Sequence, residues 1–201
     1  MSARPLSLEI ELGQLLDLVA ADSAAAGAGT VATLATALAA GLVAMTARRS
    51  RSSWDGAAAA AGQAEVLRSR ATALLPESGS AYEDAVARLA QAKAHEGERS
   101  DVHDWNLGQA LRRAARTPLR CAEIAADIAE LAGEVATRCE AASRPDVIAA
   151  GRLAESAAAV GAHLVEVNLV AGADDELRAR ALLVVDQARR GWERVASESE
   201  R

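Results

Sequence analysis

The sequence predicts an all-α protein, an antiparallel bundle of long helices packed around a central helix of small residues. Alanine, the best helix former, supplies about a quarter of the chain, whereas aromatic residues, which favour strands, make up only 2%. Residues 24–47 hold no charged side chain and stop against Arg48 and Arg49. The 201 residues fit one domain, 1–201, with its own core. Since Ala, Leu and Val fill little volume, we expect further contacts between the subunits of a homodimer.

The first half of the chain predicts four helices. Leucines at helical spacing mark the first, and an uncharged stretch marks the second, with Leu34, Leu38, Leu42 and Met45 as its large stripe. Basic residues in its last turn suit the helix dipole. Pro76 stops the third helix. The expected ranges are 6–21, 30–50, 57–75 and 80–93, with breaks at 22–29 and 52–56.

The second half predicts a polar loop and four more helices. The loop, 94–104, precedes a short helix that ends near Arg116. Thr117 and Pro118 then form an expected helix start, an N-cap followed by proline. That helix turns Ile124, Ile128, Leu131 and Val135 inward. The last two helices follow a break at 143–146 and the acidic start at 174–176. The expected ranges are 100–116, 117–142, 146–170 and 174–197.

The net charge and the two cysteines indicate which partners and which cellular compartment to expect. A net charge of −6 without a basic stripe excludes a general nucleic-acid binder. Cys121 and Cys139 fall in one predicted helix, where eighteen residues span roughly 27 Å, far beyond the ~7 Å limit for a disulfide. We expect reduced thiols in a cytoplasmic protein without a signal peptide.

The uncharged stretch 24–47 is long enough to cross a membrane. Its content of Ala, Gly and Thr is poor for that role, and no second span accompanies it. We therefore expect a buried helix and no membrane partner.

The common catalytic motifs are absent. His95, His103 and His163 show no metal-ligand spacing with Cys or carboxylates, so we expect no metal site. The run from Gly27 to Thr30 precedes a helix, and amides at a helix start can hold an anion or a polar ring edge. Taken alone, this run is better explained as a tight glycine turn.

The order of the segments resembles the cyclodeaminase/cyclohydrolase family, which includes formimino-tetrahydrofolate cyclodeaminase and methenyl-tetrahydrofolate cyclohydrolase. The family's Pro-Gly-Gly-Gly-Ser-Val-Ala run corresponds to residues 26–32, which keep Gly27, Gly29 and a hydroxyl at Thr30. Lys93 stands where the family has a Leu-Pro-Lys lysine, at the same distance from the aromatic residue, here Tyr82. The segments TPLRCAEIA (117–125), Arg144-Pro145-Asp146 and LVEVNL (164–169) resemble its Val-Pro-Leu, Ser-Asp and Asn-Val-x-Ile-Asn-Leu motifs, keeping Asp146 and Asn168.

Two departures from the family pattern concern the chemistry. Ala28 replaces a glycine of the turn, and residues 76–80 lack the family's aspartate run, leaving Glu77 as the nearest carboxylate. Leu164 also stands where the family has its first Asn.

The resemblance implies an enzyme of tetrahydrofolate one-carbon metabolism, with a reduced folate as substrate and no permanently bound cofactor. It implies catalytic roles for Lys93, Asp146 and Glu77. It also implies substrate contacts from Gly27, Gly29, Thr30, Arg48, Arg49 and Asn168. Ordinary structural roles remain open for each: a solvated helix end for Lys93, an N-cap for Asp146, helix-end charges for the arginines, and an interhelical hydrogen bond for Asn168. The alternative function is a catalytically degenerate relative that binds folate or serves as a structural helical dimer.

Overall fold

The computed structural model describes residues 9–21, 26–77, 87, 90, 101–169 and 174–199, without the side chains of 101–104 and 199. Regular structure within these ranges is helical, which confirms the all-α prediction. The helices are α1 (Leu12–Ala20), α2 (Ala28–Arg49), α3 (Ala57–Thr72), α5 (Asp101–Ala136), α6 (Arg144–Leu169) and α7 (Asp175–Ser199), with short 3-10 turns η2 (Ser50–Ser52) and η3 (Ala141–Ser143).

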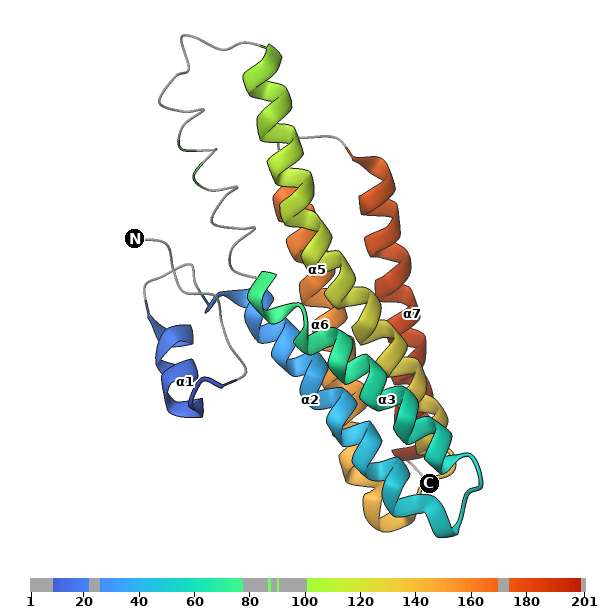
Figure 1. Cartoon of the computed structure of the whole chain (residues 1–201). Coiled ribbons are helices and arrows are strands. Elements are labelled where there is room, and N and C mark those ends of the chain that lie inside the picture. The colour runs from blue at the N-terminus through green and yellow to red at the C-terminus, as the bar shows by residue number, and fades with distance from the viewer. Residues whose placement is uncertain are drawn as a thin grey trace.

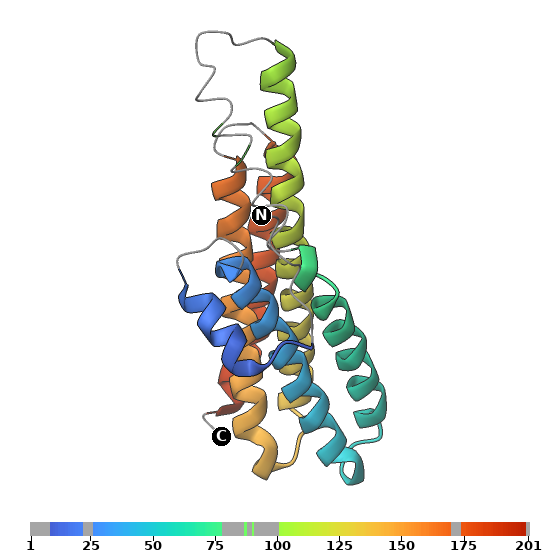
Figure 2. The ribbon, with the colours of Figure 1, turned by 60° about the vertical axis from the view of Figure 1, so that its left-hand side comes forward.

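Helices α2, α3, α5, α6 and α7 form an elongated bundle, and α5 is its longest member (Figure 1). Contacts near the end of α2 fix the directions of its neighbours. Arg48 bonds to Glu65 of α3, and Arg49 bonds to Asp146 at the start of α6. Further along α3, Arg68 Cδ lies 3.9 Å from the position of a Cβ on Gly41, earlier in α2, so α3 runs antiparallel to α2. Asp146 lies at the start of α6 and next to the end of α2, so α6 is antiparallel to α2 as well. Helix α1 lies outside the bundle in both views and has no buried residue (Figure 2).

Small residues build the core where the helices cross. Ile124, Ile128, Leu131 and Val135 are buried, as the sequence predicts. A Cβ added to Gly191 of α7 would lie 2.5 Å from the carbonyl carbon of Ala129 in α5. These two helices touch through their backbones, which an alanine-rich and glycine-containing sequence permits.

Helix α2 turns its small residues inward, and of its large stripe Leu38 faces outward whereas Leu42 packs against the core. Ala39, Ala40, Val43 and Ala44 are fully buried, whereas Leu38 is 64% exposed. Within the described ranges, one segment, Ala28–Ser52, is long and apolar enough to cross a membrane, and 44% of its apolar window is buried inside the bundle. The inward side thus belongs to the core, and the apolar outer side remains open to a partner.

The predicted helix start at Thr117 and Pro118 is wrong. Helix α5 runs without interruption from Asp101 to Ala136 and contains Pro118. It also includes residues 101–104, which the sequence assigned to a loop. Proline removes one backbone hydrogen bond from a helix interior, so tertiary contacts must compensate for it here.

Other helix boundaries in the structure differ from the predicted ones by several residues. Helix α1 begins at Leu12, α3 ends at Thr72, and α5 ends at Ala136 rather than near Ala142. Pro76 is itself helical, together with residues 75 and 77, so it does not simply end α3. The helix expected over 80–93 lies mostly outside the described residues. Asp174 opens α7 as predicted, because its Oδ1 accepts the backbone N–H of Leu177 at 3.2 Å.

Candidate functional site

The start of α2 carries the glycine run that the sequence singled out. Gly27 is the N-cap residue, with φ −83° and ψ −163°, and no side chain caps the helix. No described glycine has a positive φ, so Gly27 is not a left-handed turn residue. A Cβ on Gly27 would meet nothing within 4 Å. The predicted tight glycine turn is therefore ordinary extended backbone at Gly27, with open space beside it.

Three threonines and a thiol lie under this end of α2. Thr30, Thr33 and Thr36 are buried. Thr33 Oγ1 lies 3.6 Å from Cys121 Sγ, and Thr36 Oγ1 lies 3.5 Å from it. Burial raises the pKa of the Cys121 thiol, so it stays protonated and unreactive near neutral pH. The sequence signal that could have revealed this cluster is threonine at every third position of 30–36.

Asn168 compensates for the proline inside α5. The backbone N–H of residue 118 would normally donate to the carbonyl of Ala114, but Pro118 has none. Asn168 Nδ2 donates to that carbonyl at 3.4 Å instead. Helix α6 can come this close because residue 161 is a glycine. A Cβ at this position would lie only 2.7 Å from the carbonyl oxygen of Pro118. Asn168 thus bonds across helices, and its predicted substrate contact stays a prediction.

This arrangement predicts a coupled effect of two substitutions. Asn168→Ala should lower the free energy of unfolding by about 1–3 kcal/mol, because it leaves a buried carbonyl without a partner. Adding Pro118→Ala should recover much of that loss, because an alanine at this position brings a backbone N–H to the same carbonyl. Urea unfolding of the single and double variants measures the coupling, and strictly additive effects would contradict the assignment.

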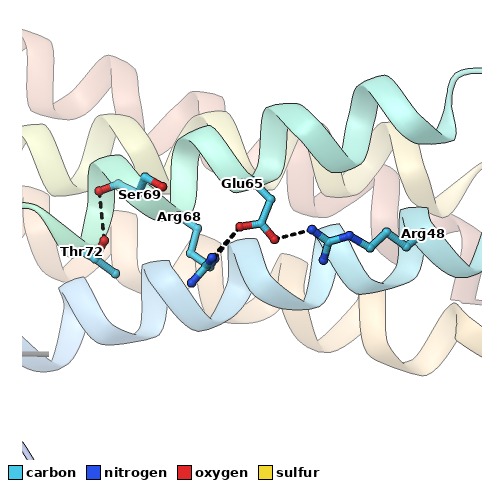
Figure 3. A network of polar contacts seen from close by, with 5 residues as sticks. All are labelled: Arg48, Glu65, Arg68, Ser69 and Thr72. Atoms are coloured by element: carbon cyan, nitrogen blue, oxygen red, sulfur yellow. Dashed lines mark hydrogen bonds and ion pairs between the residues drawn. The ribbon is translucent and has the colours of Figure 1, made fainter. Parts of the chain in front are cut away.

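The opposite end of α2 carries the two arginines. Glu65 accepts hydrogen bonds from Arg48 Nη2 at 2.6 Å and from Arg68 Nε at 2.8 Å (Figure 3). The Arg48 bond, followed by that of Arg68, lowers the pKa of Glu65 below its ordinary 4.5. Arg49 Nη1 lies 3.1 Å from Asp146 Oδ2, with side chains 55% and 35% exposed. Both predicted binding arginines therefore have carboxylate partners within the chain.

The lowered pKa of Glu65 predicts a pH-dependent loss on substitution. Glu65→Gln should destabilise the protein near neutral pH by about 0.5–1 kcal/mol, the scale of a partly exposed ion pair. Since the carboxylate titrates at lower pH when folded, the stabilisation is present above pH 4.5 and disappears as pH falls below it. Thermal melts from pH 7 to pH 3 test this. Glu155→Gln, which removes the partner of Arg152 alone, is the control, and equal pH profiles would contradict the prediction.

The predicted site residues divide between two ends of the bundle. Gly27, Gly29 and Thr30 begin α2, and Asn168 lies near the end of the antiparallel α6. Arg48, Arg49 and Asp146 lie at the other end. A rise of 1.5 Å per residue separates Thr30 from Arg49 by about 28 Å. One subunit therefore does not bring these two groups together.

The remaining predicted site residues are Glu77 and Lys93. The carboxylate of Glu77 lies 3.1 Å from Arg120 Nη1, and its side chain is 51% exposed. Arg120 directly precedes Cys121, so Glu77 belongs to the same end as Thr33 and Thr36. Lys93 lies outside the described residues, so its predicted role remains a prediction.

A groove of about 620 Å³ lies between α3, α5 and α7, and none of the predicted site residues that the structure describes lines it. Asp127, Glu130 and Glu134 line its α5 wall. Burial raises the pKa of Asp127, an effect that Arg70 partly offsets. The sequence analysis overlooked these carboxylates, although their spacing places them on one helix face. No group of three or more His, Cys, Asp or Glu suited to a metal occurs among the described residues.

Comparisons with known proteins bear on this geometry. A solved structure of formiminotetrahydrofolate cyclodeaminase from Thermotoga maritima has the same fold, with a TM-score of 0.80 and 22% sequence identity. The alignment covers 96% of each chain. No curated protein matches the sequence. The family model described as formiminotransferase-cyclodeaminase matches residues 11–187, which is most of the chain. The chain is therefore a member of the formiminotransferase-cyclodeaminase family.

Proposed function

We propose that this protein acts on a reduced folate carrying a one-carbon unit, within tetrahydrofolate one-carbon metabolism. The observation that carries the proposal is the family match over residues 11–187. The shared fold with a formiminotetrahydrofolate cyclodeaminase supports it. The proposed activity is formimino-tetrahydrofolate cyclodeaminase or methenyl-tetrahydrofolate cyclohydrolase.

Both reactions take place at one carbon and need proton transfer to or from the nitrogen and oxygen atoms bonded to it. In cyclodeamination, a second folate nitrogen attacks the formimino carbon, the bond from that carbon to the imino nitrogen breaks, and ammonia leaves with the transferred protons. In cyclohydrolysis, water adds to the methenyl carbon, one carbon–nitrogen bond breaks, and a proton is released. A positioned acid or base contributes typically 10²–10⁴-fold to such steps, and a nearby cation or amide dipole stabilises the shifting charge.

Lys93, Asp146 and Glu77 are the proposed catalytic residues. Lys93 would supply the cation or the proton, and Asp146 would orient it or contact the pterin. Glu77 would replace the missing aspartates of residues 76–80. Its half-exposed ion pair with Arg120 leaves the carboxylate accessible to solvent.

Arg48 and Arg49 are proposed to meet the carboxylates of the folate glutamate. Exposed ion pairs contribute only about 0–1 kcal/mol, so a ligand carboxylate can replace Asp146 beside Arg49 at little cost. A guanidinium also has five N–H donors, which permits it to bind a ligand and its present partner together.

The methenyl absorbance tests the proposal directly. Purified protein is mixed with methenyl-tetrahydrofolate and, separately, with the formimino derivative. We expect the absorbance to fall faster than in buffer with the first, or to rise faster with the second. Rates equal to buffer for both substrates, with folate binding retained, would leave the alternative function, a degenerate relative that binds folate. Absence of binding would contradict both folate functions and leave the structural helical dimer of the alternative.

Lys93 offers a specific test because it is the only lysine in the chain. Lys93→Ala should lower turnover about 100-fold or more, the scale of a lost acid–base group, with unchanged helix content by circular dichroism. Acylation of the wild-type lysine should have the same effect, and the acylating reagent should not affect the Lys93→Ala variant further. Unchanged kinetics would remove Lys93 from the site.

We also propose that the protein is a cytoplasmic homodimer, joined through an outer face that we call the α2/α6 face. Its apolar side chains recur at helical spacing on two adjacent helices, and each is at least one-third exposed. Charged side chains close one end of this face, at Arg49 and Asp146. The exposed apolar members are Val31 and Leu38 of α2 and Leu153, Val160 and Val167 of α6.

The size of the α2/α6 face fits a second copy of the chain. From Val31 to Arg49 it is about 27 Å long, and two helices side by side are about 20 Å wide. The roughly 500 Å² of projected surface approaches the ~800 Å² per partner of a standard interface once side-chain relief is included. Helix α1 exposes Leu12, Leu16 and Val19, and it lies outside the bundle next to α2, where it can add to this interface (Figure 1).

A further inference from the structure

We infer that Arg120 is a positioning residue, whose guanidinium holds the Glu77 carboxylate in place at the Gly27–Thr30 end of α2. This inference rests on the proposed function, in which Glu77 is a catalytic carboxylate. It adds a residue that the sequence analysis did not single out. Its starting observation is the ion pair between the two side chains, in which Arg120 Nη1 donates to Glu77 Oε2 at 3.1 Å.

Both members of this ion pair are attached to backbone that the core holds in place. Leu74 is fully buried, and its carbonyl accepts the backbone N–H of Glu77 at 3.1 Å. On α5, Arg120 stands between Leu119 and Cys121, which are both buried. Because neither backbone can shift freely, the place of the carboxylate depends on the side-chain torsions of Glu77 and on its bond to Arg120.

Cys121 connects Arg120 to the start of α2. Its Sγ lies 3.6 Å from Thr33 Oγ1, and that hydroxyl donates to the carbonyl of Gly29 at 2.8 Å. Successive residues of a helix point about 100° apart, so α5 presents Arg120 to Glu77 and Cys121 to Thr33. A single turn of α5 therefore fixes the carboxylate relative to the glycine run.

The ion pair contributes more to position than to stability. The two side chains are 56% and 51% exposed, and exposed pairs of this kind stabilise a fold very little. An exposed glutamate without a partner samples several rotamers, whereas a general acid or base must lie within hydrogen-bond reach of its proton. A displacement of about 1 Å at such a group can cost about 100-fold in rate.

Steady-state kinetics of Arg120 variants tests the inference on whichever folate derivative the wild type converts. Arg120→Ala should lower kcat about 100-fold, with KM within about threefold of the wild-type value and unchanged helix content. Arg120→Lys should keep at least about a tenth of wild-type kcat, because lysine retains the charge and a donor for this single contact. A raised KM with unchanged kcat would make Arg120 a substrate-binding residue and overturn the inference, as would equal kcat losses in the two variants.

A double substitution shows whether Arg120 acts through Glu77. Glu77→Gln should lower kcat about 100-fold or more, because it removes the proposed acid–base group. Adding Arg120→Ala to Glu77→Gln should then have no further effect on kcat, since the carboxylate that Arg120 holds is already gone. Losses that multiply in the double variant would mean that Arg120 acts independently of Glu77, and they would overturn the inference.

Arg180→Ala is the matched control. It removes another exposed ion pair of α5, the bond of 2.7 Å between Arg180 of α7 and Glu123. This variant should keep wild-type kcat. A loss equal to that of Arg120→Ala would indicate general loosening of α5 and overturn the positioning role.

The outcomes separate this inference from the proposed function. An active wild type whose kcat is unchanged by Glu77→Gln and by Arg120→Ala would overturn the inference and leave the proposed function intact. A wild type that converts neither folate derivative would contradict the proposed enzyme, and the positioning role of Arg120 would fail with it.

Discussion

Gly191→Ala is expected to destabilise the protein by about 3 kcal/mol, at the upper end of the usual cost of overpacking. The new Cβ would lie 2.5 to 2.7 Å from three backbone atoms of Ala129 and Glu130. Backbone atoms inside a helix cannot rotate away, so α5 and α7 must separate along their contact. For a chain of this length, the change should lower Tm by roughly 10 °C.

Gly62→Ala is the matched control for this prediction. Gly62 also lies inside a helix, α3, but a Cβ there would meet nothing within 4 Å. Alanine should therefore raise stability by about 0.5–1 kcal/mol through the smaller entropy of the unfolded chain. If Gly191→Ala does not fold, Gly151→Ala provides a milder test, because its Cβ would lie 3.0 Å from Val195 Cγ2. Equal stability changes at positions 191 and 62 would contradict the close approach of α5 and α7.

Leu38→Glu is expected to convert the proposed dimer into a monomer. Leu38 is the most exposed apolar side chain of the α2/α6 face, so the substitution places a charge from each subunit in an apolar interface. Burial of each unpaired charge costs several kcal/mol, and each 1.4 kcal/mol weakens association tenfold. The Kd for dimerisation should rise at least about 100-fold, measured by analytical ultracentrifugation over a dilution series.

Val66→Glu is the control for Leu38→Glu. Val66 is 60% exposed, much like Leu38, but it lies on α3 and outside the α2/α6 face. The Val66 variant should dimerise as the wild type does, and both variants should keep wild-type helix content. A Leu38→Glu dimer as tight as the wild type would contradict the proposed interface.

The fold was predictable because its strongest signals are local. Alanine content, helical spacing of leucines and the acidic start at Asp174 each act within one or two turns, and the structure confirms the helices they predict. The helix start predicted at Pro118 failed for the opposite reason. Proline is favourable in the first turn of a helix and costly inside one. The compensation, a hydrogen bond from Asn168 to Ala114 O, comes from a residue far along the chain.

Which face of a helix packs against the core was harder to predict than the helix itself. The large residues of α2 form a regular stripe in the sequence, and such a stripe normally faces the core. In the structure the small residues face the core, because α3, α5 and α6 pack closely against α2, and Leu38 faces outward. Helical periodicity identifies two different faces but does not state which one meets the rest of the chain.

The sequence by itself determined that this protein is an all-helical member of its family, because helix propensity and ordered motifs are properties of neighbouring residues. Only the tertiary structure decided where the candidate site residues lie. The antiparallel packing of α2 and α6 puts Gly27, Thr30 and Asn168 at one end and Arg49 and Asp146 at the other. That separation depends on helix length and packing direction, which no single motif encodes.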